Sequence, residues 1–212
     1  SPSRRLILMI IFLFLCIRFI PIEILNVDIP FLTTLLSNNT FSSLFVLLCF
    51  LFVINGANLI DGFNGLLTIN LIIINLILAY INLADGINEF TIVIIGQIIV
   101  LFSFLLFNFP SAKIFLGDSG SYLLGSLVAL NVIVTNNLNP DYSSFFFCIL
   151  LFYLFFEVFF SFFRKIIQKK SPIHPDDKHL HMLVFKKVSI IFGKDKGNYI
   201  NSLIINLGYL SF

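Results

Sequence analysis

Six long apolar stretches, separated by short polar segments, run through this sequence of 212 residues. Each approaches the roughly 20 mostly apolar residues that a helix needs to cross the hydrocarbon core of a bilayer. Runs such as LILMIIFLFLCI and FFFCILLFYLFF do not alternate in polarity, which favours helices over the strands of a membrane barrel. The stretches are Leu6–Ile22, Phe41–Ile60, Leu66–Leu83, Phe90–Phe107, Ser119–Val134 and Ser143–Phe163.

Composition excludes most other kinds of protein. Hydrophobic residues make up 58% of the chain and charged residues 11%, too apolar for one soluble core or for a disordered chain. The three cysteines are an odd number in apolar runs, unlike a disulfide framework. A shorter, more polar stretch, Tyr199–Phe212, ends the chain. We therefore predict an all-α fold, a polytopic helical transmembrane bundle with six full spans and a partial seventh, as one membrane domain over residues 1–212.

The basic residues predict how this bundle is oriented. Threading six spans through a bilayer places 12 of the 13 Lys and Arg residues on one side or at its boundary, with Arg18 as the exception. Cytoplasmic loops of membrane proteins carry such an excess of positive charge. The side that holds the basic residues is therefore predicted to be cytoplasmic, and residues 164–196 are predicted to be a basic cytoplasmic loop.

Three polar clusters interrupt the apolar pattern, all on the predicted cytoplasmic side. The first is NGANLIDGFNGL, in which Asn55, Asn58, Asp61 and Asn64 are spaced by three and so lie near one face of a helix. The DG and NG pairs are typical of a simple turn. A carboxylate and several amides together at a membrane boundary instead favour a ligand site, because polar groups there are costly.

The second cluster is NFPSAKIFLGDSGSYLLG, which contains Asn108, Lys113 and Asp118. One interpretation is structural, with Asp118 or Ser119 capping the helix that follows. The other is functional, because the free N–H groups at a helix start attract phosphate and a lone carboxylate suits Mg²⁺ with substrate phosphates.

The third cluster is the hydrophilic segment RKIIQKKSPIHPDDKHLHMLVFKK. His179 and His181 share a face only if their stretch is extended. Zinc needs three or four ligands, which this segment scarcely offers. A basic tail that only sets membrane orientation is one interpretation, and an anion clamp for a diphosphate is the other. One short basic loop at a membrane argues against nucleic-acid binding.

Glu157 and Arg164 frame the end of the sixth stretch. Seven residues place both on one helix face, about 10 Å apart, which is too far for a direct ion pair. Glu157 is therefore either a buried structural acid or one that faces a substrate.

Together the three clusters resemble the polyprenyl-phosphate N-acetylhexosamine-1-phosphate transferases. That family includes undecaprenyl-phosphate GlcNAc-1-phosphate transferases and phospho-N-acetylmuramoyl-pentapeptide transferases. The resemblance rests on NLIDGFNGL at 58–66, NFPSAKIFLGDSGSYLLG at 108–125 and PDDKHLH at 175–181, in this order and on one side. The last motif, with SP at 171–172, is closer to the GlcNAc-type branch.

The resemblance implies a reaction and a site. A UDP-N-acetylhexosamine gives its phosphosugar to undecaprenyl phosphate at the cytoplasmic face of a bacterial inner membrane, with Mg²⁺ as cofactor and release of UMP. Such a step would start a lipid-linked cell-envelope glycan. The resemblance leaves the oligomeric state open, with a homodimer as one alternative. By position, Asp118 resembles the Mg²⁺ ligand and Asp61 a further catalytic residue. The residues that would bind substrate are Asn58, Asn64, Asn108, His179 and His181, to which we add Lys113 as a phosphate contact.

The sequence also departs from the family pattern. Asn64, Glu157 and Met182 stand where many members have Asp, Asp and His, changes expected to alter sugar preference more than reaction type. Members carry an Asp-Asp pair just before the span that begins here near Leu6, and no such pair precedes it. We therefore expect an N-terminally truncated piece that is inactive alone. A transporter or a non-catalytic scaffold is the alternative function.

Overall fold

The computed structural model describes residues 2–20, 22–25, 27–169 and 178–211. All the regular secondary structure in these ranges is helical, which confirms the predicted all-α class. The helices are α1 (Pro2–Phe19), α2 (Pro30–Leu36), α3 (Asn39–Ile60), α4 (Leu66–Ala84), α5 (Asn88–Asn108), α6 (Gly117–Leu138), α7 (Ser144–Leu150), α8 (Phe152–Ile167), α9 (Leu180–Phe192) and α10 (Lys194–Leu210).

Four of these helices, α3 to α6, are long and apolar enough to cross a membrane. The α7–α8 pair would make a fifth span, but it bends by 71° at the break between its two helices. The apolar part of α1, Leu6–Phe19, is shorter. The structure thus supports four or five candidate spans among the described residues, and the finer prediction of six plus a partial seventh is not confirmed.

The third polar cluster is more ordered than the loop predicted for residues 164–196. α8 continues to Ile167, α9 occupies Leu180–Phe192, and α10 begins at Lys194. A single glycine, Gly193 with φ +78°, separates α9 from α10. The described part of this segment is therefore largely helical, and its place as a cytoplasmic connection between spans stays a prediction.

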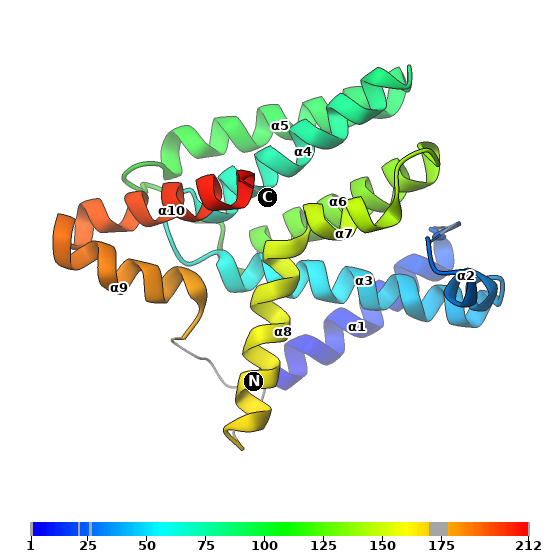
Figure 1. Cartoon of the computed structure of the whole chain (residues 1–212), viewed down its shortest axis with the longest axis horizontal. Helices are drawn as coiled ribbons and strands as arrows, with labels where there is room; N and C mark the ends of the chain where they lie inside the picture. The colour runs from blue at the N-terminus through cyan, green and yellow to red at the C-terminus, as the bar shows by residue number, and fades with distance from the viewer. Residues whose placement is uncertain (1, 21, 26, 170–177, 212) are drawn as a thin grey trace.

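Helix α3 lies at the centre of the bundle and packs against α1, α6 and α8, while α4 packs against α5 and α6 (Figure 1). Two glycines permit the closest of these contacts. A Cβ on Gly56 would lie 2.7 Å from the Leu154 carbonyl oxygen of α8, and one on Gly125 of α6 would lie 3.0 Å from the Ala57 Cβ. Small residues allow helix backbones to approach in this way within membranes.

The break between α7 and α8 turns α8 across the direction of the other helices (Figure 1). A break frees backbone carbonyls that apolar surroundings cannot satisfy. Here the Tyr209 hydroxyl of α10 donates to the carbonyl of Leu150, the last residue of α7. Helix α10 therefore stabilises the point at which α8 changes direction.

Buried amides connect the spans inside the bundle. Asn131 of α6 donates through Nδ2 to Asn75 Oδ1 of α4 at 2.9 Å and to Gln97 Oε1 of α5 at 2.7 Å. Further along, Asn82 donates to the Thr135 hydroxyl at 2.9 Å. Because these amides bond to one another, they join helices in the way that polar side chains do between membrane helices.

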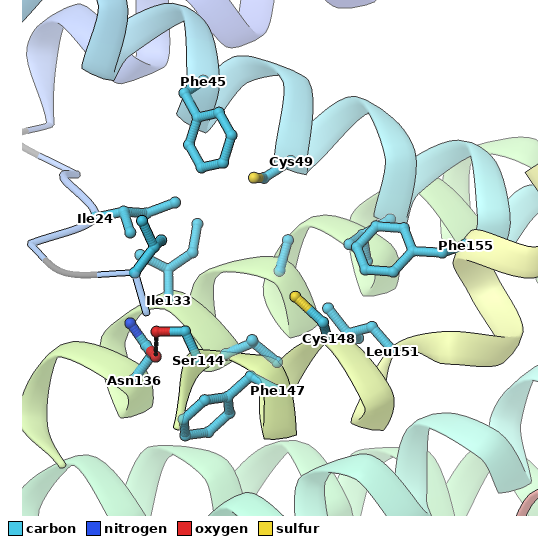
Figure 2. A pocket seen from close by; sticks show the side chains of 14 residues that line it. Ile24, Phe45, Cys49, Ile133, Asn136, Ser144, Phe147, Cys148, Leu151 and Phe155 are labelled. Atoms are coloured by element: carbon cyan, nitrogen blue, oxygen red, sulfur yellow. Dashed lines mark hydrogen bonds between the residues drawn. The ribbon is translucent and has the colours of Figure 1, made fainter. Parts of the chain in front are cut away.

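A cavity of about 120 Å³ lies between α3, α6, α7, α8 and the segment before α2. Figure 2 shows Phe45, Cys49, Phe147, Cys148 and Phe155 among the side chains on its walls. The lining is almost wholly apolar, so the cavity suits hydrocarbon and not a charged group.

Candidate active site

The first two polar clusters meet at one end of the bundle. α3 ends at Ile60 and α4 begins at Leu66, and between them the chain turns through Gly65 with φ +76°. α5 ends at Asn108 and α6 begins at Gly117 beside this turn. Residues more than 40 positions apart in the sequence thus come within hydrogen-bonding distance.

Asn58 joins the two clusters directly. Its Nδ2 donates to Asp118 Oδ1 at 3.2 Å and to the Ser121 hydroxyl at 3.0 Å. Asn58 occupies the last turns of α3, and both partners lie at the start of α6. The donor orients the Asp118 carboxylate while leaving the side chain exposed to a ligand.

Asp61 immediately follows α3 and is partly buried. Burial and the neighbouring charge of Asp118 together raise the pKa of the Asp61 carboxyl to about 7. Two carboxylates that repel one another in this way are stabilised by a cation. The site therefore places the exposed Asp118 carboxylate next to a partly buried acid, Asp61, whose pKa lies near neutrality.

Asn64 and Asn108 hold the two loops together. Asn108 is buried and accepts from the Gly65 N–H at 2.7 Å while donating to the Ile114 carbonyl at 2.9 Å. Asn64 donates through Nδ2 to the Pro110 carbonyl at 2.8 Å. In this structure both amides fix loop shape, and Lys113 is exposed in the loop between α5 and α6.

The prediction that Asp118 or Ser119 caps α6 is wrong. Helix α6 begins earlier, at Gly117, and its N-cap residue Leu116 forms no side-chain capping bond. The positive φ of Gly117, +64°, lets the chain enter the helix one residue before Asp118. Asp118 lies in the first helical turn, where the helix dipole favours a negative charge.

The histidines of the third cluster lie at the start of α9. His179 is the extended N-cap residue, with ψ 151°, and His181 is in the first turn. Their rings stack with an interplanar angle of 2° and centroids 5.5 Å apart. From the sequence, the two histidines are expected to share a face only if their backbone is extended. His179 alone is extended, and this is enough to place the two rings side by side.

Both rings contact Glu157, which is fully buried on α8. His179 Nδ1 lies 2.8 Å from Glu157 Oε2, and His181 Nδ1 lies 3.3 Å from Oε1. Of the two interpretations of Glu157, the structure supports the buried acid. Arg164 does not pair with it but donates to the Lys178 carbonyl at 2.8 Å.

His181 links the third cluster to the first. Its ring packs edge-on against Phe63, with centroids 5.6 Å apart. A Cβ built on Gly62 would lie 3.8 Å from His181 Nε2. That nitrogen is buried and has no hydrogen-bond partner among the described residues. The free side of the imidazole therefore faces the loop that carries Asp61.

Three contributors to the site were not singled out from the sequence: Ser121, Asn198 and Tyr153. Asn198 accepts from the Asn64 N–H at 2.8 Å, and the Tyr153 hydroxyl lies 3.2 Å from His181 Nδ1. Only Tyr153 had a usable signal, since it precedes Glu157 by one helical turn. The described residues contain no group of three His, Cys, Asp or Glu side chains that could hold a metal. Residues 175–177 of the PDDKHLH motif lie outside the described residues.

The fold and this site define a helical membrane protein with paired carboxylates at one end of its bundle. Comparison with known families agrees, because residues 1–136 match the model of glycosyl transferase family 4. The chain belongs to this family, and it is a multi-pass membrane protein.

Individual relatives are similar over part of their length. The undecaprenyl-phosphate alpha-N-acetylglucosaminyl 1-phosphate transferase of Thermotoga maritima is 34% identical over 147 residues, covering 68% of this chain and 43% of that protein. The phospho-N-acetylmuramoyl-pentapeptide-transferase of Leuconostoc mesenteroides is 46% identical over 82 residues, 38% of this chain and 25% of the relative. The phospho-N-acetylmuramoyl-pentapeptide-transferase of Clostridium perfringens is 33% identical over 109 residues, which cover 51% of this chain and 34% of that protein. The chain thus spans less than half the length of these relatives.

Proposed function

We propose that this chain belongs to an enzyme that transfers an N-acetylhexosamine 1-phosphate from a UDP-sugar to a polyprenyl phosphate, undecaprenyl phosphate in a bacterium. The observation that carries the proposal is that Asp61, at the end of α3, lies close enough to Asp118 of α6 to feel its charge, while Asn58 bonds to the Asp118 carboxylate. Family membership and the printed activities of the relatives support it.

The reaction is a phosphoryl transfer. An oxygen of the polyprenyl phosphate attacks the phosphorus that carries the sugar, a new P–O–P linkage forms, and the bond to UMP breaks. The products are polyprenyl diphosphosugar and UMP. Such a step depends mainly on positioning and on neutralising phosphate charge. We assign those tasks to the polar end of the bundle.

The donor set fits a magnesium ion. Mg²⁺ commonly takes one or two protein carboxylates together with substrate phosphates. Burial is the main cause of the raised pKa of Asp61 and the charge of Asp118 the second, and a bound cation would relieve the repulsion between the two carboxylates. We propose Asp118 as the ligand and Asp61 as the second catalytic carboxylate; when bound, the ion neutralises diphosphate charge.

The remaining residues would hold the substrates. Asn58 orients Asp118, and Asn64 and Asn108 shape the loops that face the nucleotide. Lys113 supplies a donor for phosphate oxygens. The His179–His181 pair would bind the UDP-sugar beside the Asp61 loop. The apolar cavity between α3 and α8 lies deeper in the bundle and offers a place for hydrocarbon of the lipid acceptor.

The proposed location is the inner membrane of a bacterium, with the site on the cytoplasmic face. The excess of Lys and Arg on one side of the threaded chain supports this orientation. The UDP-sugar would arrive from the cytosol and the lipid acceptor from the bilayer. Self-association as a homodimer belongs to the same proposal.

A transporter is the main alternative, and the buried amides argue against it. A transport path is lined by polar groups that water or substrate can reach. Asn75, Gln97 and Asn131 instead bond to one another between α4, α5 and α6. A non-catalytic scaffold would have no need of two carboxylates in mutual repulsion.

The test uses the complete open reading frame that contains this chain. Purified protein is assayed for UMP release from UDP-GlcNAc, undecaprenyl phosphate and Mg²⁺, beside Asp118→Asn. Mg²⁺-dependent release that the variant abolishes supports the proposal, and release with another UDP-amino sugar changes only the substrate. No release from folded protein with any UDP-sugar of a panel overturns it.

We further propose that residues 1–212 alone are inactive, because the acidic pair expected before Leu6 is absent from them. The same assay on the isolated chain tests this. Turnover by folded 212-residue protein contradicts it.

A further inference from the structure

Helix α8 supports the histidine segment through three side chains. The Tyr153 hydroxyl lies 3.2 Å from His181 Nδ1, Glu157 contacts both histidines, and Arg164 donates to the Lys178 carbonyl at 2.8 Å. These residues are spaced by four and seven along α8, so they lie near one face of the helix. The partners in these contacts lie within residues 178–181. This face of α8 therefore holds the segment in place.

Glu157 forms the largest share of these contacts. Its Oε2 accepts from His179 Nδ1 at 2.8 Å, and its Oε1 accepts from the Leu180 N–H at 3.0 Å, with His181 Nδ1 at 3.3 Å. The carboxylate is fully buried. A buried carboxylate must be matched by donors, and the N–H groups of His179 and Leu180 supply two of them, with His181 Nδ1 close by.

The contacts with Glu157 bear on where the imidazole protons are. A carboxylate only accepts, so His179 Nδ1, which bonds to Glu157 Oε2 at 2.8 Å, carries a proton. His181 Nδ1 lies 3.3 Å from Glu157 Oε1 and 3.2 Å from the Tyr153 hydroxyl, and we assign its proton to the contact with the carboxylate. Neutral imidazole then presents an unprotonated Nε2 on the opposite edge. For His181 that edge is the buried Nε2 without a partner, next to Gly62 and the Asp61 loop. Glu157 thus sets both the tautomer and the direction of the free nitrogen.

The fold places Glu157 where it can act. Helix α8 departs by 71° from α7, and Gly56 lets it lie against α3 with the Leu154 backbone in close contact. Glu157 follows Leu154 by one turn, and its neighbour His181 lies beside Gly62, the residue after Asp61. The bend therefore connects the histidine segment to the carboxylate site.

We propose that Glu157 is a positioning residue that fixes the tautomer and orientation of His179 and His181, so that His181 Nε2, as a hydrogen-bond acceptor, faces the O–H and N–H donors of the UDP-sugar beside the Asp61–Gly62 loop. The inference rests on the proposed transferase function for its substrate. Its geometric part, the control of the tautomer by Glu157, stands independently and has its own readout.

The experiment compares Glu157→Gln and Glu157→Asp in the protein from the complete open reading frame. Glu157→Gln keeps the size of the side chain but removes the charge and one acceptor. Glu89→Gln is the matched control, since Glu89 is an exposed acid in the first turn of α5 at the other end of the bundle. Thermal unfolding of each variant in detergent reports whether it is folded.

The first readout is nitrogen NMR with ¹⁵N-labelled histidine. The chain has three histidines, and His174→Gln identifies the signal of the one outside the pair. At one fixed pH, Glu157→Gln is expected to change the Nδ1 and Nε2 shifts of His179 and His181 from the pattern of Nδ1 protonation, while Glu89→Gln leaves them unchanged. Unchanged shifts in folded Glu157→Gln overturn the proposal, whatever the activity assay gives.

The second readout is steady-state kinetics. Loss of a partner that orients a functional histidine is expected to lower kcat about 10–100-fold, with a much smaller change in KM for the UDP-sugar. Glu157→Asp restores part of kcat because its shorter carboxylate still accepts. Wild-type kcat in Glu157→Gln, or a loss explained wholly by unfolded protein, overturns the positioning role. Inactivity of the wild-type protein refutes the proposed function instead, and the NMR result then decides the tautomer on its own.

Discussion

Asn58 and Asp118 lie 60 positions apart in the sequence, and a hydrogen bond of 3.2 Å joins the Asn58 amide to the Asp118 carboxylate. The same amide donates to the Ser121 hydroxyl at 3.0 Å. Asn58, near the end of α3, thus fixes the orientation of the Asp118 carboxylate in the first turn of α6. This connection predicts that Asn58 contributes to activity by orienting Asp118.

Asn58→Leu is expected to lower kcat/KM for the UDP-sugar about 10–100-fold, because the Asp118 carboxylate loses its orienting donor. The measurement is UMP release by the protein from the complete open reading frame. Asn55→Leu is the control, since among the described residues Asn55 Nδ2 donates within its own helix, to the Leu51 carbonyl at 2.6 Å. Equal losses in the two variants would contradict the prediction and point to a general defect of α3.

Gly56→Ala is expected to destabilise the protein, because the new methyl group would lie 2.7 Å from the Leu154 carbonyl oxygen and 2.9 Å from the Leu154 Cβ. The carbonyl oxygen is a backbone atom and the Cβ is fixed to the backbone, so neither can move away by a side-chain rotation. Forcing extra volume into a packed contact costs about 1–3 kcal/mol. Thermal unfolding in detergent measures the effect.

Gly96→Ala on α5 makes the same chemical change in open surroundings, with no atom within 4 Å of the new Cβ. It should be neutral or slightly stabilising, since alanine is the better helix former. A Gly56→Ala protein as stable as Gly96→Ala would show that α8 is not held against α3 as the structure has it.

The outlines of α3, α4 and α5 were predictable from the sequence to within two residues at each end. Their apolar runs end at polar residues or glycines, and these mark helix ends locally. The bend before α8 was not predictable, because the run CILLFYLFF contains neither glycine nor proline. Its causes are tertiary: the contact of Leu154 with Gly56 and the bond from Tyr209 to the Leu150 carbonyl.

In the candidate site too, some features were predictable from local sequence and others depend on tertiary contacts. Residue types and spacing singled out Asp61, Asp118, His179 and His181, since polar groups at a membrane boundary are costly and so carry information. Their partners did not follow from spacing. Glu157 bonds across 22 positions to His179, and such a pairing depends on where α8 lies after its bend.

Asp28 gives a prediction for pH, at the end of the bundle away from the carboxylates. Its Oδ2 accepts from the Ser143 hydroxyl and from the Ser144 N–H at the start of α7, and these bonds lower the pKa of Asp28. The folded pKa lies below the unfolded one, so the ionised acid stabilises the folded state above about pH 4. That contribution is lost as the pH falls further.

The measurement is the unfolding temperature of wild-type protein and Asp28→Asn between about pH 3 and pH 7. Asp28→Asn is expected to unfold at a lower temperature at neutral pH, and the two curves should converge below about pH 4. Asp85→Asn, an exposed acid after α4 for which no side-chain bond is described, serves as the control. A difference between wild type and Asp28→Asn that is constant across the range would refute the ionised pairing.

Asn131→Leu tests whether the amides between the spans stabilise the bundle. Asn131 bonds to Asn75 and Gln97, so its removal leaves both without these partners in apolar surroundings. Interhelical hydrogen bonds of this kind contribute about 1–2 kcal/mol at most, and the unfolding free energy of Asn131→Leu should fall by about that amount. Titration with SDS in mixed micelles measures the change.

Asn70 supplies the matched control, because it is fully buried on α4 and neither atom of its amide has a hydrogen-bond partner among the described residues. Replacing an unsatisfied buried amide by an apolar group of similar size is neutral or stabilising. Asn70→Leu should therefore unfold at the same or a higher SDS concentration than wild type, while Asn131→Leu unfolds at a lower one. The opposite order would mean that burial alone, and not the bonds between Asn75, Gln97 and Asn131, determines what these amides contribute.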